Sequence, residues 1–413
     1  MVNYVFLSVY FYSVPNLRFS FEEDWCTSTI GENFRLSSGL TPSTKEKAYF
    51  NNGIIPWINS GELKNKYISF TENKLTLDAV KKHNLTIYPM DTMVIAIYGL
   101  EAAGVRGKAS ITKMDSTISQ SCMAFNSLGN VLTQFMYYVY KKEAQILGTR
   151  YAQGTKQQNL SSDLLSSYKL LYPSKEEQLK IVNFLSLIDE KIETQSKIIE
   201  EYVILKNSLI HRFFTMDNPK VKLSTILTEI NIKNKNKQID TVLSVSNKLG
   251  FIKQSEQFED REVASDDTSN YKIVNKGDYA YNPARINVGS IARLINYDKG
   301  IISPMYSCFK INEKKITYTY FDMFLSSFSF KRQLNKKLEG SVRQCLTFEG
   351  MLSMDIELPC IETQKSISNK IDMLNYKIKL ESDYREALIK QKQFLLNNMF
   401  MAMSQQLVDN SGF

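Results

Sequence analysis

The chain has 413 residues, a formal net charge of +8, five Cys and two His. This length predicts two to four domains, and the hydrophobic and charged fractions of 43% and 23% exclude long disorder or a collagen-like chain. No Cys lies in a CxxC pair, so a disulfide framework and a zinc ribbon are disfavoured; reduced thiols in a cytosol are favoured, and two His leave little for a metal site or a catalytic triad.

The N-terminal region contains the apolar run Val5–Tyr12. It is shorter than the roughly 18–20 residues of a membrane span. No basic stretch precedes it and no small-residue cleavage site follows, which argues against a signal peptide. We expect a buried strand, or a start codon assigned too far upstream, and a cytoplasmic protein without a membrane partner. Residues 1–24 are interpreted as an N-terminal extension.

Two segments, 25–160 and 219–345, have the pattern of mixed α/β domains. Runs rich in β-branched and aromatic residues, bounded by Gly, Pro, Asn and Asp, predict strands. These runs are Thr92–Tyr98, Thr241–Val245, Asp278–Tyr281 and Ile301–Ile311. Helices are predicted over Tyr137–Leu147 and Tyr320–Leu338. The two segments share little identity, so we expect two different domains.

An internal repeat organises the chain. Residues 154–214 align without a gap with residues 340–400, at a constant offset of 186. The alignment matches Pro173 with Pro359 and Gln178 with Gln364. A period this long indicates two copies of a whole module, not a solenoid.

Each copy continues after its Pro into a predicted long helix, within residues 161–218 and 346–413. About forty residues without internal Pro or Gly would form a rod of roughly 60 Å. Apolar residues recur at steps of four and three, the pattern of a coiled-coil seam. The predicted seam consists of Ile181, Leu185, Ile188, Ile192, Ile199, Tyr202 and Leu209 in the first copy, and of Ile367, Ile371, Leu374, Ile378, Leu388 and Leu395 in the second.

Polar residues interrupt the two seams in register: Gln195 matches Glu381, and Lys206 matches Lys392. The pattern favours two helices that pair with each other or that bind a partner. The alternative is that each long helix packs only on its own domain.

The positive charge is concentrated on the two dissimilar segments. Residues 25–160 carry a net +6 and residues 219–345 a net +8, whereas the helices are close to neutral. Basic domains suit a polyanion, because each neutralised phosphate releases a counterion. Solubilising lysines on solvated faces are the alternative.

Polar and cationic residues in predicted loops are candidate DNA contacts. Arg can bond bidentately to guanine, and Asn or Gln to adenine. The candidates are Asn59, Ser60, Lys64, Arg106, Lys108, Lys156 and Gln157 in the first segment, and Ser246, Asn247, Lys248, Asn282, Arg285, Asn287, Arg343 and Gln344 in the second. Each of them could equally be a turn former.

No complete catalytic motif is present in the sequence. Gly99–Gly107 fails the phosphate-loop pattern GxxxxGK[ST], because Ala109 follows Gly107-Lys108. Asn282-Pro283 begins like an adenine-methyltransferase box but continues without the second Pro and the aromatic residue. Asp266-Asp267 lacks the nearby Glu-x-Lys of a nuclease core. We therefore expect a chain without catalytic or metal-binding residues.

Several motifs resemble the specificity subunit of type I restriction–modification enzymes. They are Pro56–Gly61, the helix openings Pro173…Glu176…Gln178 and Pro359…Glu362…Gln364, and Gly277-Asp278 followed by Asn282-Pro283. The resemblance covers residues from about 14 to 400. Two departures are residues 1–13, which match nothing expected, and Thr363, where the family usually has an acid.

The resemblance implies an α+β fold in which two target recognition domains alternate with two long helices that pair as an antiparallel coiled coil. Each domain would read one half of a bipartite, asymmetric site in double-stranded DNA. The helices would set the spacing and dock two methyltransferase subunits, which restriction/translocase subunits join. S-adenosylmethionine, ATP and Mg²⁺ would belong to these partners, and this chain would bind no cofactor. The alternatives are a self-contained methyltransferase or nuclease with divergent motifs, and a coiled-coil protein scaffold.

Overall fold

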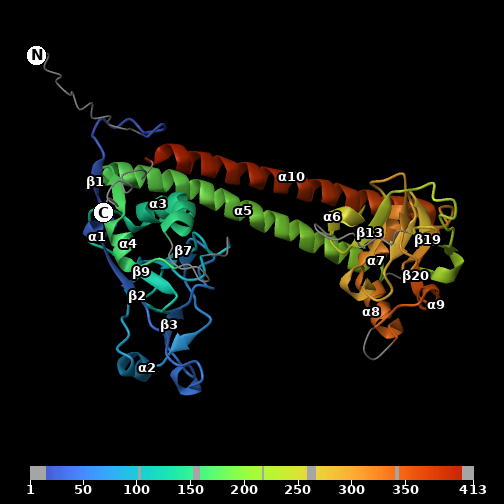
Figure 1. The fold of residues 1–413 in the computed structure, drawn as a ribbon, viewed down its shortest axis with the longest axis horizontal. Coiled ribbons are helices and arrows are strands. Elements are labelled where there is room, and N and C mark those ends of the chain that lie inside the picture. Colours follow the sequence, from blue (N-terminus) through green and yellow to red (C-terminus); the bar gives the residue numbers. More distant parts are fainter. Residues whose placement is uncertain are drawn as a thin grey trace, which may run out of the picture. The chain divides into compact units, whose positions relative to one another are not determined.

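The computed structural model describes residues 15–100, 104–151, 159–215, 218–257, 267–339 and 344–401. It consists of two compact units. Unit 1 comprises the described parts of residues 1–194 and 384–413, and unit 2 those of residues 195–383. Each unit joins one β-rich lobe to parts of two long helices, so the fold class is α+β (Figure 1).

The lobe of unit 1 contains three sheets. The largest has the strand order β2-β9-β6-β7-β4, antiparallel except for the parallel pair β7 and β4, and a smaller sheet has the order β5-β3-β8. Their bounds are β2 (Phe34–Ser38), β3 (Ile55–Ile58), β4 (Tyr67–Ile68), β5 (Lys74–Leu75), β6 (Met93–Ala96), β7 (Ala109–Thr112), β8 (Thr117–Ile118) and β9 (Cys122–Ser127). The third sheet pairs β1 (Cys26–Thr29) with β10 (Lys169–Tyr172).

Helix α3 (Thr133–Ile146) belongs to the main core of this lobe. Its buried aromatic residues pack with Phe125 of β9 and with apolar residues of the long helices. The described residues of this lobe also include the shorter α-helices α1 (Ile30–Asn33), α2 (Leu77–Lys82) and α4 (Ser162–Ser167).

The lobe of unit 2 also contains three sheets, with a different topology. Two four-stranded sheets have the orders β12-β19-β16-β17 and β14-β13-β18-β15. Their bounds are β12 (Leu227–Ile230), β13 (Val242–Ser246), β14 (Gly250–Lys253), β15 (Lys272–Asn275), β16 (Tyr279–Tyr281), β17 (Ile291–Arg293), β18 (Lys299–Ile302) and β19 (Ser307–Ile311). The third sheet pairs β11 (Lys220–Lys222) with β20 (Asp355–Glu357). The helices of this lobe are α6 (Gln254–Gln257), α7 (Tyr318–Ser326), α8 (Phe328–Lys337) and α9 (Phe348–Leu352).

Most predicted elements of the two lobes are confirmed within a few residues. Strand β6 lies inside the run predicted over residues 92–98, β13 coincides within one residue with 241–245, and β16 lies inside 278–281. Helix α3 covers most of the helix predicted over 137–147.

Two predictions were wrong, because each merged two elements. Residues 301–311 form β18 and β19, separated by a turn at Pro304, where a proline has no N–H for a strand ladder. Residues 320–338 form α7 and α8. Ser327 ends α7, where its backbone N–H donates to the Phe324 carbonyl, and starts α8, where its hydroxyl accepts from the Phe330 N–H.

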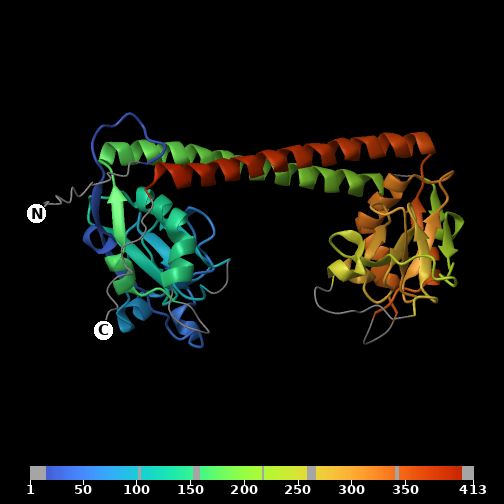
Figure 2. The ribbon, with the colours of Figure 1, turned by 45° about the horizontal axis from the view of Figure 1, so that its top comes forward.

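The long helices α5 (Lys175–Phe213) and α10 (Ile361–Met399) have 39 residues each and follow the offset of 186 to the residue. Within each unit, their segments run side by side and antiparallel (Figures 1 and 2). In unit 1, Lys392 Nζ lies 2.5 Å from Asp189 Oδ1. In unit 2, Lys206 Nζ donates to Asn375 Oδ1 at 3.2 Å, and Gln195 Nε2 donates to its repeat counterpart Glu381. The polar interruptions of the seam therefore face polar partners.

Apolar seam residues are most deeply buried where the helices meet the lobes. Ile181, Leu185, Ile188 and Leu395 belong to the core of unit 1, and Ile367 and Ile371 to that of unit 2. Leu388 is buried as well, whereas Ile192, Ile199, Tyr202, Leu209, Leu374 and Ile378 are half-buried.

The repeated Gln at the start of each long helix fastens that helix to its lobe. Gln178 Nε2 donates to the carbonyl of Pro173, and its Oε1 accepts from the N–H of Leu132, the residue that precedes α3. Gln364 repeats these contacts with Pro359 and with Thr317, the residue that precedes α7. All four distances are 2.9 Å, and both side chains are fully buried. One amide thus stabilises a turn and positions a second helix in each unit.

A charged cluster attaches the unit 1 lobe to both long helices. Tyr138 of α3 donates to Asp189 at 2.6 Å, and Lys66 donates to Tyr138 and to Ser186 of α5, both at 2.8 Å. Burial lowers the pKa of Lys66 to about 8.

We expect Gln364→Leu to destabilise unit 2. The substitution leaves the half-buried Thr317 N–H and the Pro359 carbonyl without the amide as a partner, at a cost of about 1–3 kcal/mol in the free energy of unfolding. Urea unfolding followed by circular dichroism measures the change. Gln393→Leu, at an exposed position of α10, should change stability little. Equal stabilities of the two variants would contradict the structural role of Gln364.

Candidate nucleic-acid interface

Three predicted residues of the first lobe share one turn after β3. Asn59 Oδ1 accepts from the Gly61 N–H at 2.8 Å, and the Asn59 N–H donates to the Glu62 carboxylate. Asn59 thus forms the turn with its side-chain oxygen, while Ser60 is half-buried and Lys64 is exposed. Burial raises the pKa of the Glu62 carboxyl.

Arg106 and Lys108 lie in a different loop, which leads into β7. Arg106 is half-buried, and its Nε donates to the carbonyl of Leu100 at 2.7 Å. Lys108 is also half-buried. Lys156 and Gln157 lie outside the described residues. The sequence candidates of this lobe therefore belong to at least two loops.

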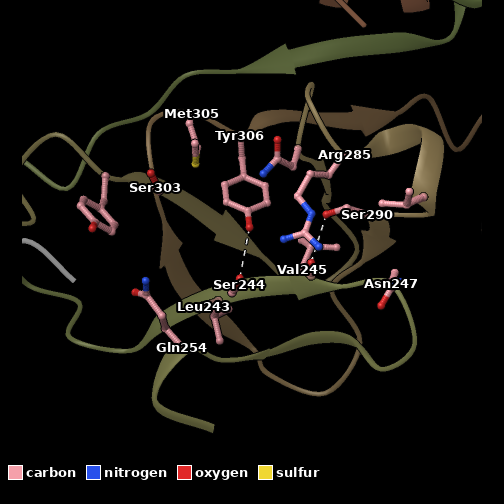
Figure 3. A pocket seen from close by; sticks show the side chains of 13 residues that line it. Leu243, Ser244, Val245, Asn247, Gln254, Arg285, Ser290, Ser303, Met305 and Tyr306 are labelled. Carbon is pink, nitrogen blue, oxygen red and sulfur yellow. Dashed lines mark hydrogen bonds between the residues drawn. The ribbon is translucent and has the colours of Figure 1, made fainter. Parts of the chain in front are cut away.

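In unit 2, three predicted residues line one cavity of about 320 Å³ (Figure 3). Asn247 follows β13, Asn282 follows β16, and Arg285 lies in the turn after Asn282. The lining residues are Leu243, Ser244, Val245, Asn247, Gln254, Tyr271, Asn282, Arg285, Val288, Ser290, Ser303, Met305 and Tyr306. Strand ends from two sheets thus bring amide groups and a guanidinium together.

The Asn-Pro motif builds the turn that presents Arg285. Asn282 is only 9% exposed; its Oδ1 accepts from the Ala284 N–H at 3.0 Å, and its backbone N–H donates to the Ser290 carbonyl. The Arg285 N–H returns to the Asn282 carbonyl at 3.0 Å, and the Arg285 side chain is exposed. Asn282 is therefore a framework residue, and Arg285 has access to a ligand.

The remaining candidates of unit 2 differ in accessibility. Ser246 Oγ accepts from the N–H groups of Lys248 and Leu249, so it stabilises the β13–β14 turn and leaves Asn247 and Lys248 exposed. Asn287 and Gln344 are exposed too. Arg343 lies outside the described residues.

Three wall residues of the cavity were missed by the sequence reasoning. Tyr306 OH and Ser244 Oγ lie 3.1 Å apart, while Gln254 Oε1 is buried without a partner among the described residues (Figure 3). Gln254 belongs to a four-residue helix, which is too short to be predicted from a hydrophobic period in the sequence. Carboxamide and guanidinium groups around a small cavity can recognise the edge of a nucleobase.

Within the described ranges, no cluster of three or more His, Cys, Asp or Glu could hold a metal ion. The helices of those same ranges include none with the length and apolarity that crossing a bilayer requires.

Residues 22–201 match the family model of the type I restriction modification DNA specificity domain. The chain is 32% identical over 182 residues to the type I restriction enzyme MjaIX specificity subunit of Methanocaldococcus jannaschii, an alignment that covers 42% of this chain and 40% of that protein. It is 27% identical over 169 residues to the EcoR124I/EcoR124II specificity subunit of Escherichia coli, covering 41% of each. The chain thus spans about two fifths of the length of these curated relatives.

Two solved structures share the fold over nearly the whole chain. The S subunit of a type I restriction-modification system from M. genitalium aligns with a TM-score of 0.56 at 16% identity and covers 95% of this chain and 100% of that one. A chain from a study of complex assembly and conformational transition of the type I R-M system aligns with a TM-score of 0.58 at 11% identity, covering 91% and 97%. At these identities the structural likeness concerns the fold. The chain is therefore similar in sequence to type I restriction–modification specificity subunits over residues 22–201, and similar in fold to such subunits over most of its length.

Proposed function

We propose that this chain is the DNA sequence-recognition subunit of a type I restriction–modification complex and that it catalyses no reaction itself. The observation that carries the proposal is that two dissimilar lobes are fastened to two copies of one helical frame by the same buried amide, Gln178 and Gln364. A repeated helical scaffold that carries two different lobes suits a protein in which each lobe recognises a different DNA sequence. The family match over residues 22–201 supports the same function.

Each lobe, in this proposal, reads one half of a bipartite, asymmetric site. The target recognition domains correspond to residues 25–160 and 219–345, and the family's conserved regions with their helices to 161–218 and 346–413. In the second lobe, Arg285 and Asn247 at the cavity rim are the proposed base readers, since both are exposed and lie near Gln254. The paired helices, each of 39 residues, would set the spacing between the half-sites.

An exposed apolar stripe on α10 supports partner docking. Met373, Tyr376 and Leu380 are 72%, 70% and 48% exposed and recur at steps of three and four, so they lie on one face of the helix. Large apolar side chains exposed as a group mark protein interfaces. We propose that methyltransferase subunits dock on the long helices and that restriction/translocase subunits join them. S-adenosylmethionine, ATP and Mg²⁺ would be bound by these partners.

We expect a host that expresses this chain with its methyltransferase to show one two-part adenine-methylation motif. Exchanging residues 219–345 for another recognition domain should change one half of that motif, because the other lobe is unaltered. Methylome sequencing measures both. A change in both halves would contradict the modular reading.

Arg285→Ala should relax specificity at one base position of a single half-site. Losing a bidentate contact costs about 1–3 kcal/mol in discrimination, which methylation of a panel of single-base variants of the site would reveal. Arg212→Ala, at the exposed end of α5, serves as the matched control and should leave the motif unchanged. If Arg285→Ala methylates the same set of sites as the wild type, Arg285 does not contact a base.

The double substitution Tyr376→Asp/Leu380→Asp should weaken methyltransferase binding about tenfold or more, since it places charge in a desolvated apolar contact. Co-purification and analytical ultracentrifugation measure the loss, and thermal unfolding checks the fold. Gln393→Asp adds an acid elsewhere on α10 and should bind normally. If the double variant also assembles normally, the stripe is not the docking surface.

Two rival functions give different results with the purified chain. A self-contained methyltransferase or nuclease would turn over DNA when given S-adenosylmethionine or Mg²⁺ alone, whereas we expect no turnover. A protein scaffold would lack the salt-sensitive duplex binding that we expect from the assembled complex.

A further inference from the structure

Helix α8 (Phe328–Lys337) has a strongly basic composition. Its ten residues include Lys331, Arg332, Lys336 and Lys337 and no acid. None of these cations was among the candidate base contacts.

One face of α8 is firmly docked in unit 2. Phe330 and Leu334 are buried in the core. Gln333 holds Asp355 of β20 at both backbone groups: its Nε2 donates to the Asp355 carbonyl and its Oε1 accepts from the Asp355 N–H, each at 2.8 Å. These contacts fix the rotation of the helix about its axis.

The opposite face is cationic and exposed. Lys331, Arg332 and Lys336, together with Asn335, occupy positions that a helix places on one side, and all four are exposed. As far as the described residues show, no acid forms an ion pair with these three cations. Lys237 and Lys276 of the same unit, in contrast, pair with Asp267 at 3.1 Å and with Asp298 at 3.3 Å.

We propose that the exposed face of α8, formed by Lys331, Arg332 and Lys336, binds the phosphate backbone of duplex DNA without regard to sequence. This inference rests on the proposed function and assigns a division of labour within one lobe: the cavity rim reads bases, and α8 holds phosphates. Uncompensated cations on a rigid helix attract a polyanion more strongly than cations already paired with acids. Lys331 and Lys336 are separated by about 7.5 Å along the helix axis, a length over which one DNA strand carries roughly two phosphates.

The test compares the salt dependence of duplex binding by the full-length chain in its complex. In Lys331→Gln/Lys336→Gln, the slope of log affinity against log salt should become shallower by about 2, because each lost phosphate contact removes about 0.9. The loss should be the same for cognate and scrambled duplexes. The matched control Lys237→Gln/Lys276→Gln removes the same charge from ion-paired lysines and should keep the wild-type slope.

Three results would overturn the assignment: an unchanged slope in the α8 variant, an equal loss of slope in the control, or a loss of methyltransferase binding in place of DNA binding. Thermal unfolding of both variants verifies that they fold. In each case the wild-type complex still binds its site, so the proposed function stands. If the wild-type complex itself shows no salt-sensitive, sequence-selective binding, the proposed function fails first.

Discussion

The buried amide at the start of each long helix is the interaction on which the architecture depends. Gln178 and Gln364 each join the proline turn that opens the long helix to the residue that precedes a lobe helix. A carboxamide can donate to a backbone carbonyl and accept from a backbone N–H at the same time, so its loss would leave both backbone groups without their partner. Each lobe is therefore attached to its helix by one local device that does not depend on what the rest of the lobe contains.

The two units nevertheless reinforce this attachment differently. In unit 1, the Asp189 carboxylate accepts a hydrogen bond from Tyr138 and forms an ion pair with Lys392, and the half-buried Lys66 lies 3.9 Å from the same carboxylate. The corresponding residue of unit 2 is Asn375. Among the described contacts, its side chain accepts a hydrogen bond from Lys206 alone. Since a neutral amide attracts a cation less than a carboxylate does, the electrostatic contact between the two long helices is stronger in unit 1, where Tyr138 and Lys66 of the lobe also join it.

The long helices could be predicted from the sequence because proline, heptad spacing and an ungapped repeat all indicate the same boundaries. Local hydrogen bonds were harder to foresee: the caps made by Ser327 divide a single predicted helix into α7 and α8. Asn247, Asn282 and Arg285 line one cavity because β13 and β16, which belong to different sheets, end close together. No local sequence pattern predicts that these two strand ends are neighbours. The basic residues of α8 recur with a helical period, but their common face can be identified from the sequence only if Ser327 is first recognised as the cap at which α8 begins.

The strand pairs β1–β10 and β11–β20 have a consequence for the replacement of a lobe. In each unit the chain enters and leaves the lobe on neighbouring antiparallel strands, at Cys26 and Tyr172 in the first and at Lys220 and Glu357 in the second. A closed insertion of this kind is nearly indifferent to its length, because the entropy of bringing its ends together rises only logarithmically with the number of residues. An insertion of different length and sequence could therefore replace a lobe at little cost in loop-closure entropy, provided that its two end strands still pair.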